Sequence, residues 1–101
     1  DFEGHAIFLE EDRLFVFYTL LGVRVPAGRR ERLAVFLQNL NYRLKTGTFF
    51  TEEETGELTV RIMQYMTGAD WEKQELVEKL VTDCGRTADY YYPDIMREVF
   101  G

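Results

Sequence analysis

The chain begins with short apolar runs instead of a helical repeat. Residues 6–9 (Ala-Ile-Phe-Leu) are followed by the polar stretch Glu-Asp-Arg at positions 11–13, and then by the aromatic and aliphatic run Leu14 to Leu21. Two runs of this kind around a polar turn are typical of a β-hairpin. Val25-Pro26 ends the strand region, since a residue before proline favours extended backbone and proline cannot continue a ladder.

From about Ala27 the period of the apolar positions changes to that of a helix. The spacing of three and four residues places one set of side chains on a single helix face, namely Leu33, Phe36, Leu37, Leu40 and Leu44. Gly47 stands where a left-handed cap would end this helix. The sequence therefore predicts one amphipathic helix that ends just before Gly47.

The second half repeats the order of strand pair and helix. Thr48–Thr51 and Leu58–Tyr65 predict a second hairpin around a polar loop that contains Gly56. A second helix is expected after Gly68, with Asp70 as its N-cap and an apolar stripe from Trp71 to Tyr91. Pro93 is expected to interrupt this helix before a short final one, on which the apolar residues are Ile95, Met96 and Val99.

We therefore predict a single domain over residues 1–101 of the α+β class, in the order β-β-α-β-β-α-α, with helices packed on one face of an antiparallel sheet. The strand Leu14–Leu21 is apolar on both faces, with Leu14, Val16, Tyr18 and Leu20 on one and Phe15, Phe17 and Leu21 on the other. Two helices cover only one face of the sheet, so the apolar residues of the other face must be covered by an upstream helix, a second subunit or a ligand. We consider a second subunit the first choice. The predicted interface consists of Phe15, Phe17, Leu21, Met63, Tyr65 and Tyr90.

Composition and charge narrow the function classes. The chain has 101 residues, of which 46% are hydrophobic, and this is too rich for a disordered segment. No apolar run approaches the roughly 18 residues of a membrane helix. The net charge of −6 is concentrated in residues 48–101, which disfavours nucleic acid and suits either solubility or a partner of basic character. The first residue is Asp1 and not Met, so we expect an upstream segment.

The inventory of reactive side chains argues against most catalytic centres. The absence of serine and the presence of one cysteine and one histidine exclude a Ser-His-Asp triad, a Cys/His zinc site and an internal disulfide. The run Glu52–Glu57 is expected to splay into water at a hairpin tip instead of holding a metal, because it lacks the spacing of a calcium loop. Neither a cofactor nor a metal site is predicted.

Five further positions are candidates for a contact or a structural role. Arg29, Arg30 and Arg32 crowd the start of the first helix, where the helix dipole disfavours cations, so we expect either a solvated helix end or an acidic contact. Asn41 is expected to tie its helix to a neighbouring loop or strand. Cys84 is expected to be a small core residue, with a reactive thiol as the alternative.

Tyr90, Tyr91 and Tyr92 spread over about 200 degrees of a helix, so at least one of them should be exposed. Tyrosine is enriched at interfaces, because it combines a large apolar area with a polar tip. Ordinary packing of two of the three is the competing interpretation.

An ordered set of short motifs resembles the YbjN-domain family, described as bacterial sensory transduction regulators. The set comprises Val25-Pro26, Phe36-Leu37, Leu40-Asn41-Tyr42, Gly47, Phe49, Gly56-Glu57-Leu58, Val60-Arg61, Ala88-Asp89, Tyr91-Tyr92-Pro93 and Ile95-Met96. The resemblance implies a fold similar to the type III secretion chaperones, with one more helix ahead of the first strand. It also implies a small, acidic, cytoplasmic homodimer that binds protein segments and catalyses nothing. Thr51-Glu52-Glu53 departs from the family, where an Asp often follows the third strand.

Two functional hypotheses follow. The first is a non-enzymatic, homodimeric, chaperone-like module that binds client or signalling proteins, such as a sensor kinase or its partner, in bacterial signalling or stress response, without nucleic acid or membrane. The second is a small-ligand sensor or a carboxylate-based enzyme, which needs a pocket with converging carboxylates and arginines.

Overall fold

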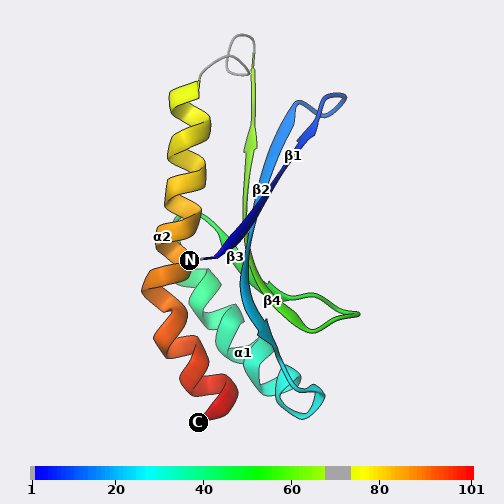
Figure 1. The fold of residues 1–101 in the computed structure, drawn as a ribbon, viewed down its shortest axis with the longest axis vertical. Helices are drawn as coiled ribbons and strands as arrows, with labels where there is room; N and C mark the ends of the chain where they lie inside the picture. The colour runs from blue at the N-terminus through cyan, green and yellow to red at the C-terminus, as the bar shows by residue number, and fades with distance from the viewer. Residues whose placement is uncertain (1, 68–73) are drawn as a thin grey trace.

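The computed structural model describes residues 2–67 and 74–101 and shows an α+β fold with a four-stranded antiparallel sheet (Figure 1). The elements follow in the order β1 (Glu3–Leu9), β2 (Leu14–Arg24), α1 (Ala27–Arg43), β3 (Thr48–Thr51), β4 (Glu57–Tyr65) and α2 (Gln74–Phe100). The strands lie in the order β1-β2-β4-β3. Helix α2 packs on β2 and β4, and α1 packs on β3. Both helices lie on the same side of the sheet (Figure 1).

Both predicted hairpins are present. In the first, Leu9 pairs with Leu14 around a polar turn, and β2 then continues to Arg24 past an irregularity after Leu20. In the second, the amide of Glu52 donates to the Glu57 carbonyl at 2.9 Å, and the amide of Gly56 donates to the Glu52 carbonyl at 2.7 Å. Gly56 has a φ of 73°, a conformation that glycine adopts without steric cost.

The prediction that Gly47 caps the first helix is wrong. Helix α1 ends at Arg43, and Leu44 already has extended backbone. Gly47 does adopt a positive φ of 87°, but it does so three residues later, where the chain turns into β3. The glycine therefore marks the bend before the strand and not the end of the helix.

The prediction of two C-terminal helices is also wrong, because α2 is one helix that contains Pro93. Its buried stripe continues on both sides of the proline, through Ala88 before it and Ile95 and Val99 after it. Pro93 has no N–H group to donate to the Asp89 carbonyl, four residues earlier. Because Pro93 and Asp89 are both exposed, water can donate a hydrogen bond to this carbonyl instead. The packing of the stripe outweighs this local cost, and the helix changes direction near its middle (Figure 1). The predicted N-cap Asp70 and the start of the stripe at Trp71 lie outside the described residues.

The hydrophobic core lies between the sheet and the two helices. Its largest fully buried side chains include Phe15 of β2, Phe49 of β3, Leu58 of β4 and Leu33 of α1. The hydroxyl of Thr19 donates to the Cys84 sulfur on α2 at 3.2 Å, which shows that the odd-numbered residues of β2 face the helices.

This orientation corrects the predicted interface. Phe15 and Leu21 are 0% and 3% exposed and belong to the core, and Phe17 is half-buried against it. The alternation of a strand places neighbouring residues on opposite faces, so Leu14, Val16, Tyr18 and Leu20 form the face that the helices leave open. Phe15 and Leu21 therefore belong to the core and not to the surface, and Phe17 lies half-buried on the same, helix-facing side.

Candidate functional site

The sheet face opposite the helices, which we call the open face, carries a group of exposed apolar side chains. Its apolar end consists of two cross-strand rows, Leu9–Leu14–Tyr65 and Ile7–Val16–Met63. Met63 is 51% exposed and Tyr65 is 70% exposed, while Val16 is buried between its two neighbours. A cluster of large apolar side chains on a sheet surface is typical of a contact with another protein.

The other end of the open face is polar and is hollowed. A pocket of about 180 Å³ is lined by Tyr18, Leu20, Phe50, Glu52, Thr55, Glu57 and Thr59, and we call it the Tyr18 pocket. Beside it the Arg61 guanidinium lies over the Phe50 ring, 5.4 Å from the ring centre. The open face thus combines an apolar end with an end that bears aromatic rings and carboxylates.

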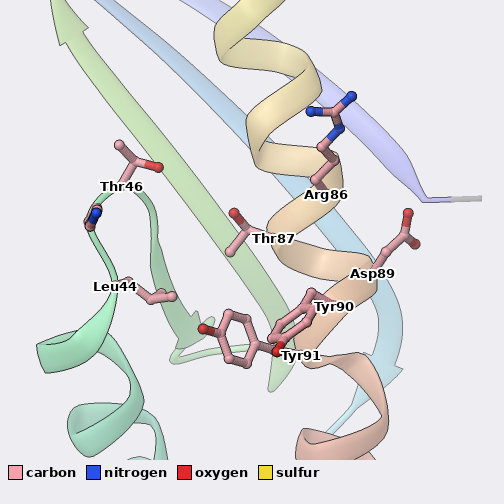
Figure 2. Close-up of a pocket in the computed structure, with 8 residues that line it drawn as sticks. Leu44, Thr46, Arg86, Thr87, Asp89, Tyr90 and Tyr91 are labelled. Atoms are coloured by element: carbon pink, nitrogen blue, oxygen red, sulfur yellow. The ribbon is translucent and has the colours of Figure 1, made fainter.

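A shallower and larger groove of about 610 Å³ lies between α2 and the link from α1 to β3 (Figure 2). The link contributes Leu44, Lys45 and Thr46, and α2 contributes Arg86, Thr87, Asp89, Tyr90 and Tyr91. In Figure 2 the Thr87 side chain points toward the link, whereas Arg86 and Asp89 point away from it. The groove is thus lined by Tyr90 and Tyr91, with the charges of Arg86 and Asp89 at its outer margin.

The tyrosine rings in this groove are fixed by aromatic packing. Tyr91 meets the Phe49 ring edge-on at 6.1 Å and the Tyr90 ring edge-on at 4.8 Å. Tyr91 and Tyr92 are half-buried and Tyr90 is exposed, so the interpretation of two packed tyrosines and one exposed tyrosine is confirmed. Sequence reasoning missed the groove itself, because Leu44 to Thr46 lie some forty residues before the tyrosines and no local pattern brings the two segments together.

The six residues predicted as one interface do not share a surface. Met63 and Tyr65 lie on the open face, Tyr90 lies on α2, and Phe15, Phe17 and Leu21 face the helices. Of these six residues, only Met63 and Tyr65 belong to the apolar end of the open face.

Two of the three arginines at the start of α1, Arg30 and Arg32, make different contacts. The Arg30 Nε donates to the Val25 carbonyl at 3.0 Å, and its guanidinium lies against Gly56, where an added Cβ would overlap it. Arg32 approaches Glu98 of α2 at 3.8 Å across an exposed gap. Arg30 thus joins the first turn of α1 to the β3–β4 hairpin. This contact is with backbone carbonyl and glycine, not with the acidic loop side chains.

Asn41 and Cys84 have the structural roles that the sequence predicts. The Asn41 side chain exchanges two hydrogen bonds with the backbone of Phe49. Cys84 is fully buried, accepts from Thr19 and lies 3.7 Å from the Val60 carbonyl. Burial raises the pKa of the Cys84 thiol, and the hydrogen bond from Thr19 opposes this only in part.

Three observations concern other classes of function. Among residues 2–67 and 74–101 no three His, Cys, Asp or Glu side chains gather closely enough to hold a metal ion. Neither of the described helices combines the length and the apolar character that crossing a bilayer requires. Comparison with known proteins finds no family model, no curated protein and no solved structure that matches the chain.

Proposed function

We propose that the chain is a non-enzymatic protein-binding module: a chaperone-like homodimer, similar to the YbjN-domain family, that acts as an adaptor or regulator in bacterial signalling or stress response in the cytoplasm. In this proposal a second copy covers the apolar end of the open face. Client segments, such as part of a sensor kinase or its partner, bind to the remainder of that face.

The exposed apolar end of the open face carries this proposal. Ile7, Leu9, Met63 and Tyr65 are all exposed around the buried Val16. Burying such side chains stabilises a complex by about 25 cal/mol for each Å² of apolar surface removed from water. Since the two helices occupy the opposite face, this gain is available only to another chain or another part of a longer one.

The groove of Figure 2 favours the second candidate function, a small-ligand sensor. Its volume of about 610 Å³ lies in the range of small-molecule sites, and Tyr90 and Tyr91 offer aromatic surface beside Lys45 and Arg86. The charges of Lys45, Arg86 and Asp89 are mixed and do not select one class of ligand, so we place this function second.

The experiment for the first function is a molar-mass measurement by light scattering at low micromolar concentration. We expect a dimer for the wild-type chain and a monomer for Tyr65→Glu, since a carboxylate on the apolar end would be buried without a partner. Tyr42→Glu is the matched control, because Tyr42 is 91% exposed on α1 and distant from the open face in the fold. It should remain a dimer.

Two results would contradict this assignment. A monomeric wild-type chain would contradict the proposed homodimer. A folded Tyr65→Glu variant that is still a dimer would show that the interface lies on another surface.

For the second candidate function, a thermal-shift screen of metabolites, metals and nucleotides should show dose-dependent stabilisation by a true ligand, and Tyr90→Ala should abolish this stabilisation.

A further inference from the structure

The Tyr18 pocket on the polar end of the open face has the size of a site for a single side chain. Its volume of about 180 Å³ is well below the roughly 300–1,000 Å³ typical of small-molecule sites. It lies on a sheet face that no described element covers, beside the surface that we assign to protein contact. An occupant is therefore one protruding group of a larger partner.

The walls and rim of the pocket define the chemistry of that group. Tyr18, Leu20 and Phe50 offer apolar and aromatic surface, while Glu52 and Glu57 contribute carboxylates. Two of the pocket hydroxyls form hydrogen bonds within the chain, since that of Thr55 accepts from the Glu57 amide and that of Thr59 donates to the Glu57 carbonyl. The groups left to meet an occupant are the two carboxylates, the Tyr18 hydroxyl and the aromatic faces.

These two carboxylates make no ion pair with the described arginines that lie near them. Within the described part of the chain, neither Glu52 nor Glu57 forms an ion pair. Arg24 lies opposite Glu57 in the strand register without an ion pair to it, and Arg61 lies over Phe50 without lining the pocket. Arg61 also illustrates that the Phe50 ring accepts a guanidinium.

We propose that the Tyr18 pocket holds the lysine or arginine side chain of a bound client segment. The long aliphatic stem of such a residue packs on Tyr18, Leu20 and Phe50, and its charged head meets Glu52 and Glu57. This inference rests on the proposed function and deepens it, because it assigns a basic residue to the client. Along β2, the pocket residue Tyr18 is two residues, or roughly 7 Å, from Val16 of the apolar end, so the pocket adjoins the surface that we assign to the second copy.

The experiment uses nuclear magnetic resonance of the ¹⁵N-labelled chain with two probes, acetyl-alanyl-arginyl-alanyl amide and its glutaminyl counterpart. We expect saturable shifts of the amide signals of Tyr18, Phe50, Thr55 and Thr59 with the arginyl probe. The glutaminyl probe should bind roughly tenfold more weakly, because it forms neither the charge contacts nor the cation–π contact.

Two double variants remove the same number of charges from one loop region. E52Q/E57Q should abolish the preference for the arginyl probe, whereas E53Q/E54Q should retain it, because Glu53 and Glu54 do not line the pocket. Equal loss in both variants would mean that only the general acidic field attracts the probe, and this would overturn the inference.

Other outcomes separate this inference from the proposed function. Equal binding of the two probes, or shifts confined to other residues, would overturn the pocket assignment while the dimer measured by light scattering stands. Binding of ethylguanidinium as tight as that of the arginyl probe would overturn the assignment to a peptide. If E52Q/E57Q is monomeric while E53Q/E54Q remains a dimer, the second copy supplies the cation that occupies the pocket. This result would overturn the assignment of the pocket to a client.

Discussion

Asn41 of α1 and Phe49 of β3 exchange two hydrogen bonds that join the last turn of the helix to the edge of the sheet. The Asn41 Nδ2 donates to the Phe49 carbonyl at 2.9 Å, and the Phe49 amide donates to the Asn41 Oδ1 at 2.8 Å. The amide and carbonyl of one strand residue point to the same edge, so the Asn41 side chain pairs with β3 as a further strand would. It thereby satisfies the free edge at the centre of a strand of only four residues.

Replacing Asn41 should destabilise the fold more than its half-buried position suggests. Asn41→Ala removes both hydrogen bonds and leaves the Phe49 amide and carbonyl without their partners, which should cost about 2 kcal/mol. Urea denaturation gives the free energy of unfolding. Asn39→Ala is the control, because Asn39 is exposed on the same helix. Equal stabilities of the two variants would contradict the role of this pair.

Cys84 should make the stability of the fold depend on alkaline pH. Burial raises the pKa of its thiol above the ordinary value of 9.0, so the unfolded chain loses this proton before the folded chain does. The contribution is fully present below the unfolded pKa, declines as the pH rises past it and is lost when the folded pKa is reached. The free energy of unfolding of wild type relative to Cys84→Ala should therefore fall above about pH 9.

The same burial should protect the thiol from chemical modification. We expect Ellman's reagent to react with Cys84 only upon unfolding, with a rate in native buffer that follows the population of open states. Rapid reaction of the folded chain, or a pH dependence that is unchanged in Cys84→Ala, would contradict the buried, neutral thiol.

Gly56 should tolerate substitution less well than another glycine of the same conformation. Gly56 and Gly22 both have a φ of 73°, but an added Cβ at Gly56 meets the Arg30 guanidinium, whereas at Gly22 it meets nothing. Gly22→Ala should cost about 1–2 kcal/mol from the left-handed backbone alone. Gly56→Ala should cost more, because it also displaces Arg30 from the Val25 carbonyl. Chemical denaturation of both variants measures the difference, and equal losses would contradict a role for Arg30 in this contact.

Local patterns in the sequence predicted most of the secondary structure. The hairpin Thr48–Thr51 with its partner strand is predicted well, since the two apolar runs and Gly56 give independent signals for strands and turn. The role of Asn41 is also predictable, because a polar amide one turn from Leu37 and Leu44 must find a partner. These are consequences of spacing within a few residues.

The face of β2 that packs on the helices is not decided by such spacing. Both faces of Leu14–Leu21 are apolar, so the pattern alone does not say whether Phe15 or Val16 points to the core. In the structure, the Thr19 hydroxyl donates to the sulfur of Cys84, sixty-five residues later in the chain. This contact shows that the face of β2 with Phe15 and Thr19 packs on the helices. The Tyr18 pocket escaped prediction for the same reason, because it joins three strands and a loop that only the sheet register brings together.

Pro93 is expected from its local sequence to end a helix, but α2 continues through it. Replacing Pro93 should therefore stabilise the fold. Proline inside a helix costs about 3 kcal/mol relative to alanine when nothing compensates it. In α2 the buried residues Ala88, Ile95 and Val99 on both sides of it maintain the helix. Pro93→Ala restores the hydrogen bond to the Asp89 carbonyl at an exposed site, so the free energy of unfolding should rise by about 1–3 kcal/mol. Thr82→Ala is the control for propensity, since Thr82 is exposed on the same helix. A loss of stability in Pro93→Ala would instead mean that the bend of α2 is needed to seat Ile95 and Val99 in the core.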